Sequence, residues 1–165
     1  MVATDQTAHT CCFLGHREIC VTEKMKRQLL ECLEDLIENK SVDTFLFGSK
    51  SQFISLCHEI TTKLKEKHPH IKRIYVRAEF PVIRESYQDY LLEKYEDTYY
   101  PENIICSGRA VYVKRNYIMI ENSQFCMFYY NQACMPLKRK SGTKIALDYA
   151  QKKHKTIYIF PVAHD

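Results

Sequence analysis

The sequence predicts an α/β fold, a three-layer sandwich with a mainly parallel sheet of about six strands. Short apolar runs alternate along the 165 residues with longer segments of helical periodicity. Within the runs, apolar residues follow one another without interruption, which is typical of strands covered by helices on both faces. The length fits one domain, and the chain contains no repeat, low-complexity tract or linker.

The predicted strands are compact apolar runs, most of which end near a glycine or at a polar segment. They cover residues 11–14, 44–47, 73–77, 103–106, 125–129 and 156–160. Five segments between them are expected to be helices, over residues 22–38, 53–64, 84–95, 109–122 and 142–153. In the first of these, Met25, Leu29 and Cys32 recur at helical spacing, and either Ser49 or Ser51 can cap the second.

Glycine is scarce, and all four glycines lie at predicted strand-to-helix junctions: Gly15, Gly48, Gly108 and Gly142. In a parallel sheet these junctions share the carboxyl edge, where α/β proteins bind ligands. Glycine there permits a positive φ and a close approach of backbone to ligand. The helix that follows directs free N–H groups at the same space, so an anion such as phosphate is the expected ligand. The glycines could instead serve only tight turns, and neither GxGxxG nor a P-loop is present.

Polar residues surround these junctions. They are His16, Arg17, Ser49, Lys50, Ser141 and Thr143. On the helix over residues 109–122, Asn116 shares an apolar face with Tyr112 and Met119, so its amide must find hydrogen bonds in the interior or on a ligand. Arg115 could pair with a phosphate through its planar guanidinium or lie on the surface.

The net charge of +4 is unevenly distributed. Residues 111–165 hold nine Lys/Arg and three Asp/Glu, whereas residues 1–110 hold 15 and 17. This asymmetry fits either an anionic partner or a solvated basic surface. The eight cysteines show no CxxC spacing and fall largely at apolar positions, as expected for reduced core residues of a cytoplasmic protein. The seven histidines form no metal-binding motif, so no metal is expected, and no apolar run approaches the ~20 residues of a membrane span.

Four segments together resemble the SLOG superfamily, Rossmann-like domains related to the Lonely Guy phosphoribohydrolases. The most similar branch is that of the YpsA-like proteins of Gram-positive bacteria and their phages. The matching segments are Cys11-Cys12-Phe13-Leu14-Gly15-His16-Arg17, Phe45-Leu46-Phe47-Gly48-Ser49, Arg115-Asn116-Tyr117-Ile118-Met119 and Ser141-Gly142-Thr143. The resemblance implies a single SLOG-like nucleotide-ligand-binding domain over residues 10–165. Residues 1–9 are expected to be flexible, as chain termini often are.

The resemblance also implies where the ligand binds. Gly142 and Thr143 match the family's phosphate-binding Gly-Gly-Thr, with Ser141 in place of its first glycine, and Gly48 begins a turn to which Lys50 adds charge. Together with the junction residues, the predicted ligand-binding set is Gly15, His16, Arg17, Gly48, Ser49, Lys50, Arg115, Asn116, Ser141, Gly142 and Thr143.

The favoured function is the non-catalytic binding or sensing of a phosphate-bearing, nucleotide-derived small molecule, with a nucleotide or an ADP-ribose derivative as the ligand and no obligatory cofactor. Hydrolytic members of the family carry a glutamate shortly after their Gly-Thr, and this chain does not. The segment over residues 131–141 is long for an α/β connection, so Lys138, Arg139 and Lys140 could close over phosphates as a lid or belong to a disordered basic loop.

Two alternatives remain. A nucleotide phosphoribohydrolase or N-glycosidase would need a carboxylate near the ribose, for which Glu79 is the better choice and Asp148 the weaker one. A nucleic-acid-binding protein would use the basic clusters together with some of the twelve tyrosines. Two short basic clusters are modest for that class, so nucleic acid is not expected as a partner. The tyrosine-bearing helix over residues 84–95 is compatible with a homodimer.

Overall fold

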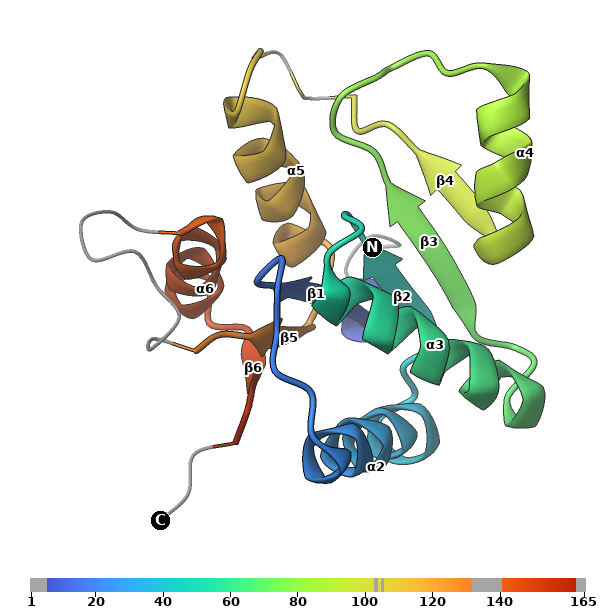
Figure 1. Cartoon of the computed structure of the whole chain (residues 1–165), viewed down its shortest axis with the longest axis vertical. Helices are drawn as coiled ribbons and strands as arrows, with labels where there is room; N and C mark the ends of the chain where they lie inside the picture. The colour runs from blue at the N-terminus through green and yellow to red at the C-terminus, as the bar shows by residue number, and fades with distance from the viewer. Residues whose placement is uncertain (1–5, 103, 105, 132–140, 163–165) are drawn as a thin grey trace.

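The computed structural model describes residues 6–102, 104, 106–131 and 141–162. Its centre is a six-stranded parallel sheet in the order β4-β3-β2-β1-β5-β6 (Figure 1). The strands are β1 (Thr10–Gly15), β2 (Thr44–Phe47), β3 (Lys72–Val76), β4 (Asp97–Tyr99), β5 (Phe125–Tyr129) and β6 (Thr156–Phe160). All five strand pairings are parallel, which confirms the predicted sheet.

Helices cover both faces of the sheet. They are α2 (Glu23–Asn39), α3 (Gln52–Lys67), α4 (Glu85–Lys94), α5 (Ala110–Glu121) and α6 (Gly142–Lys152). Buried residues of α2, α3 and α4 form one apolar core with the sheet, and those of α5 and α6 form another on the opposite face. Figure 1 shows α5 and α6 on one side of the strands and α2 and α3 on the other. The Rossmann-like three-layer sandwich is therefore confirmed.

The uninterrupted apolar strands follow from this arrangement. Along β1, Cys11 and Phe13 pack into the core on the α2 and α3 side, whereas Cys12 and Leu14 pack into the core on the other side. Because successive strand residues point to opposite faces, a strand between two helical layers needs apolar residues at every position.

Side-chain caps begin three of the helices. Thr22 accepts a hydrogen bond from the backbone N–H of Met25 at the start of α2. The hydroxyls of Ser51 and Ser141 cap α3 and α6 in the same way. Each satisfies one of the N–H groups that the first helical turn leaves free.

The fourth strand differs from the prediction. Ile104 and Cys106 are not in a strand, and β4 instead spans Asp97–Tyr99. Ile104 packs with Ala78 and Val111 in a small cluster beneath the loop, which accounts for its apolar character.

The polar edge strand β4 is held by an ion pair. Glu96, just before it, accepts bonds from the backbone N–H of Arg73 at 2.8 Å and from its guanidinium at 2.9 and 3.1 Å. A search for apolar runs misses a short edge strand fixed in this way.

Two further expectations concern the chain ends and the cysteines. Gln6 donates to the Thr44 hydroxyl at 2.9 Å, and residues 1–5 of the predicted flexible start lie outside the described residues. Cys106 and Cys20 are exposed and do not belong to the core. Cys57 is buried as expected, and its burial raises the pKa of the thiol well above its ordinary value.

Within the described residues, no helix has the length and apolarity to cross a membrane.

Candidate functional site

A cleft of about 770 Å³ opens at the carboxyl edge of the sheet. Its walls come from the loops after β1, β2 and β3, from one side of α5 and from the first residues of α6. All eleven residues of the predicted ligand-binding set line it: Gly15, His16, Arg17, Gly48, Ser49, Lys50, Arg115, Asn116, Ser141, Gly142 and Thr143. The fold thus brings together residues that lie up to 128 positions apart in the sequence, while their role in binding stays a prediction.

Two of the glycines of the cleft serve helix packing, while the approach of their backbone to a ligand stays a prediction. A Cβ on Gly15 would lie 2.5 Å from Cδ2 of Phe53, and a Cβ on Gly48 would lie 2.7 Å from Sδ of Met119. At both positions the missing side chain lets a helix pack against the end of a strand. Of the four glycines, only Gly108 has a positive φ, at 67°, and it does not line the cleft.

Arg115 forms part of the cleft although its side chain is buried. It is 5% exposed, and its Nη1 donates to the carbonyl oxygens of Gly48 and, at 3.4 Å, of Val76. Its Nε donates to Oδ1 of Asn116 at 3.0 Å. Burial lowers the pKa of the guanidinium below its ordinary value. No carboxylate among the described residues lies within ion-pair distance of it.

This arrangement turns α5 partly away from its predicted orientation. Met119 is buried as the sequence indicated, but Tyr112 on the same predicted face is 39% exposed and Asn116 is half-buried. Arg115 turns inward because the ends of β2 and β3 supply two carbonyl acceptors for its guanidinium. A buried arginine is tolerated where such acceptors are present.

His16 is anchored at the other side of the cleft. Its Nε2 accepts a hydrogen bond from the backbone N–H of Asn131 at 3.1 Å, and its ring contacts those of Tyr129 and Tyr130. Burial lowers the pKa of His16 below its ordinary value and so favours the neutral imidazole. His16 thus supplies a polar ring to the cleft.

The N-cap residue of α3 and the first residues of α6 line the cleft. Ser51 caps α3 through the N–H of Ile54 at 3.3 Å, and Ser141 caps α6 through the N–H of Lys144 at 3.0 Å. The free N–H groups of a helix N-terminus and its positive dipole end favour anions. Asp148 does not line the cleft: it pairs with the Lys144 ammonium at 2.8 Å.

Several lining residues were missed by the sequence analysis. They are Arg77, Phe80, Ile83, Tyr75 and Tyr87. Arg77 donates through Nη1 to the carbonyl of Phe80 at 3.2 Å, while its buried Nε has no hydrogen-bond partner among the described residues. Arg77 follows the last residue of β3, so the same reasoning about strand ends that selected Arg17 and Lys50 would have found it.

Glu79 is the acidic residue among those that line the cleft. Its carboxylate is exposed and accepts a hydrogen bond from the hydroxyl of Tyr112, which raises the pKa of that tyrosine. Within the described residues, no cluster of His, Cys, Asp or Glu could hold a metal ion. The basic residues Lys138, Arg139 and Lys140 lie outside the described residues.

Comparisons with known proteins show a likeness of fold. No family model and no curated protein matches the chain. The chain is similar to a solved structure of DNA processing protein A from Helicobacter pylori, which has a SLOG-type Rossmann-like fold. The alignment covers 99% of this chain and 70% of that protein's chain, with 16% sequence identity and a TM-score of 0.62. That protein is described as having a unique mode of binding single-stranded DNA.

This neighbour corrects one expectation. The sequence analysis did not expect nucleic acid as a partner, and a molecule of the same fold that binds single-stranded DNA contradicts that expectation. The comparisons support the Rossmann-like fold of this chain and give no support for the YpsA-like branch.

Proposed function

We propose that this protein binds single-stranded nucleic acid in the cleft at the carboxyl edge of its sheet. The observation that carries the proposal is the composition of the cleft. Among the described residues, four basic side chains and one acidic side chain line it, together with five phenylalanine and tyrosine side chains, of which those of Phe13 and Tyr75 are buried. Basic groups that follow a backbone and aromatic rings on which bases stack are the two elements of sequence-tolerant single-strand binding. The neighbour of similar fold supports the same conclusion.

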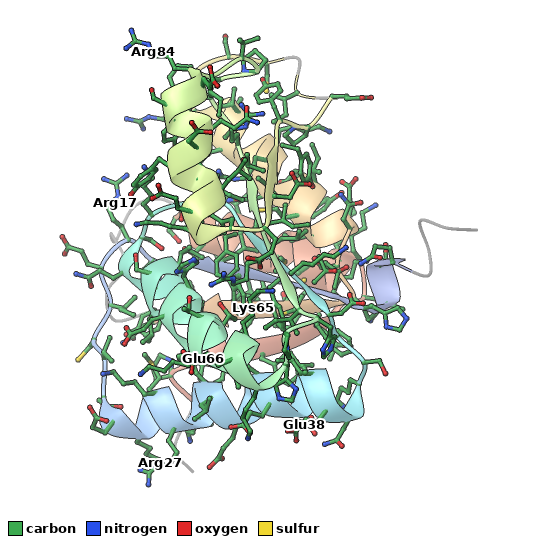
Figure 2. The ribbon with its side chains drawn as sticks, turned by 90° about the vertical axis from the view of Figure 1, so that its right-hand side faces the viewer. Arg17, Arg27, Glu38, Lys65, Glu66 and Arg84 are labelled. Atoms are coloured by element: carbon green, nitrogen blue, oxygen red, sulfur yellow. The ribbon has the colours of Figure 1, made fainter. Side chains whose placement is uncertain are left out.

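The basic groups of the cleft are suited to phosphate. Arg115 is buried without a carboxylate partner among the described residues, and the Nε of Arg77 lacks an acceptor there. An anionic oxygen would supply the counter-charge that the buried guanidinium of Arg115 lacks, because a buried cation without a counter-charge is costly. Arg17 and Lys50 are exposed at the rim, where Figure 2 shows Arg17 extending outward.

The aromatic groups are suited to bases. Phe80 is 57% exposed and Tyr112 is 39% exposed, so each has ring surface open to solvent beside the basic groups. Stacking of a base on such a ring contributes about 1–3 kcal/mol and depends little on which base is present. Recognition would therefore favour unpaired strands, whose bases are free to stack.

The test is the affinity for a labelled single-stranded oligonucleotide, measured by fluorescence anisotropy at several salt concentrations. Arg17→Gln and Lys50→Gln should each weaken binding and reduce the slope of log K against log[salt] by about 0.7. Arg27→Gln is the matched control, because it removes the same charge from an exposed position on α2 outside the cleft (Figure 2). Equal losses in all three variants, or tighter binding to duplex than to single strands, would contradict the proposal.

A second candidate is a free nucleotide or ADP-ribose derivative in the same cleft. The observation that favours it is that the N-cap residue of α3 and the N-terminus of α6 line the same cleft. A true small ligand would raise the melting temperature by mass action. A thermal shift with mononucleotides, combined with no measurable oligonucleotide binding, would select this candidate over the first.

A further inference from the structure

A second cavity adjoins the cleft. It has a volume of about 310 Å³ and lies between residues of α3 and α4. Ser49, Lys50 and Tyr75 line both spaces, so the second cavity continues from the first. Beyond these shared residues, its outer wall is formed by Tyr90 and Lys94 of α4.

One face of α4 is aromatic and basic. Residues three and four apart share a helix face, so Tyr87, Tyr90, Leu91 and Lys94 lie on one side. Leu91 is 1% exposed and anchors the helix in the core, while Tyr90 is 42% exposed. The face therefore borders the apolar interior on one side and solvent on the other.

Two acidic residues of α4 lie on its opposite side. At about 100° of rotation per residue, the helix directs the carboxylates of Glu85 and Asp89 away from the tyrosines. Glu93 lies between that side and Tyr90, and its charge acts on the Tyr90 hydroxyl. An anionic polymer that approached the tyrosine face would meet positive charge and would avoid the acidic side.

Rings and ammonium groups contact one another along this face. The rings of Tyr87 and Tyr90 are stacked, with centroids 6.2 Å apart and an interplanar angle of 16°. The ammonium of Lys50 lies 5.3 and 5.7 Å from these two centroids, and that of Lys94 lies 4.8 Å from Tyr90. Lys50 thus connects the rim of the cleft with the stacked tyrosines.

We propose that a single strand bound in the cleft continues past Lys50 across the face of α4, with bases stacked on Tyr87 and Tyr90 and with phosphates paired to Lys50 and Lys94. The inference rests on the proposed function and adds the direction in which the strand leaves the cleft. In the free protein, the two ammonium groups cover the tyrosine rings. A phosphate would attract each ammonium and leave ring surface open to a base.

A second copy of this chain is the competing occupant. The exposed apolar side chains of α4 are Tyr90 and Leu92, at 42% and 43%. Lysine is depleted at the centre of protein–protein interfaces. On this face, however, Lys50 and Lys94 both lie against the ring of Tyr90. This composition favours nucleic acid over self-association.

The experiment compares Tyr90→Leu with Leu92→Ala, a control on the same helix outside both cavities. Single-stranded oligonucleotides of two lengths are titrated, about 4 nucleotides to fill the cleft alone and about 16 to extend beyond it. Tyr90→Leu should weaken the binding of the long oligonucleotide by roughly 5- to 150-fold, the range for loss of a stacking ring. Its affinity for the short one should not change, and Leu92→Ala should match the unsubstituted protein at both lengths.

Lys94→Gln supplies an independent readout. It should reduce the slope of log K against log[salt] by about 0.7 for the long oligonucleotide. The slope for the short oligonucleotide should not change. If Tyr90→Leu and Lys94→Gln bind both lengths like the unsubstituted protein while Arg17→Gln is weakened, the path over α4 is wrong and the cleft remains the binding site. If the unsubstituted protein binds neither length, the proposed function fails as well. A dimer that Tyr90→Leu dissociates in sedimentation, without any change in oligonucleotide binding, would assign this face to self-association.

Discussion

The guanidinium of Arg115 donates to the carbonyl oxygen of Gly48 across the cleft and so ties α5 to the end of β2. The contact is close because Gly48 has no side chain: a Cβ there would lie 2.8 Å from Nε of Arg115 and 2.7 Å from Sδ of Met119. Because Gly48 has no side chain, the buried guanidinium of Arg115 reaches the end of β2 at the proposed phosphate site.

Gly48→Ala should therefore destabilise the protein and impair its binding. Forcing a methyl group into this contact displaces Arg115 or Met119, at a cost of about 1–3 kcal/mol in the free energy of unfolding. Urea denaturation measures that cost, and anisotropy with a single-stranded oligonucleotide measures the loss of affinity. Gly142→Ala is the control for the stability measurement alone, since a Cβ there meets no atom within 4 Å although the residue itself lines the cleft. An alanine at position 48 that changed neither quantity would show that Arg115 is not held by this contact.

Glu79→Gln should strengthen the binding of any anionic ligand. Glu79 is the acidic residue that lines the cleft, and removing its charge removes repulsion of about 1 kcal/mol at close range in water, or roughly fivefold in affinity. Under the hydrolase alternative, Glu79→Gln would instead abolish activity, because hydrolysis needs this carboxylate. Incubation with nucleoside monophosphates should yield no free base from the unsubstituted protein. Base release that Glu79→Gln abolishes and Asp148→Asn preserves would instead establish an enzyme.

Much of the fold could be predicted because its signals are local. β1 is apolar at successive positions since helices cover both of its faces, and Thr22 and Ser51 mark helix starts by their side-chain chemistry. β4 could not be found in the same way. Its position depends on the ion pair of Glu96 with Arg73, 23 residues away, and not on an apolar run.

The location of the site was predictable, but the orientation of its side chains was not. Strand ends of a parallel sheet lie at one edge, and that rule selected Arg17, Lys50 and Gly142. Arg115 and Asn116 are adjacent in sequence, and hydropathy favours the amide inside. Which of the two is buried depends on the carbonyl of Gly48, 67 residues away, and that information is absent from the helix itself.

Glu96→Gln should destabilise the edge of the sheet, and most clearly near neutral pH. Burial by itself raises the pKa of Glu96, but hydrogen bonds and charge from Arg73 outweigh it and lower the pKa below its ordinary value. A carboxylate with a lowered folded-state pKa contributes stability above its ordinary pKa, and this contribution disappears as the pH falls through the folded-state value. The substitution should cost about 1–3 kcal/mol at pH 7 and much less in acid. Glu59→Gln, in an exposed pair with Lys63, should cost little at either pH; equal costs for both variants would contradict this role of Glu96.

His16→Gln should reduce the loss of stability in mild acid. Burial lowers the pKa of His16 in the folded state, so the unfolded chain binds a proton more readily and stability falls as the pH drops below the ordinary histidine value of about 6.5. Protonation also removes the lone pair with which Nε2 accepts from the N–H of Asn131. Glutamine does not titrate, and its side-chain oxygen can accept the same bond. Urea denaturation at about pH 5 and about pH 8 should show a smaller difference in unfolding free energy for His16→Gln than for the unsubstituted protein. Part of the difference in unfolding free energy between the two pH values should remain, because burial also lowers the pKa of His58. If His16→Gln left the whole difference unchanged, the loss of stability in acid would come from groups other than His16.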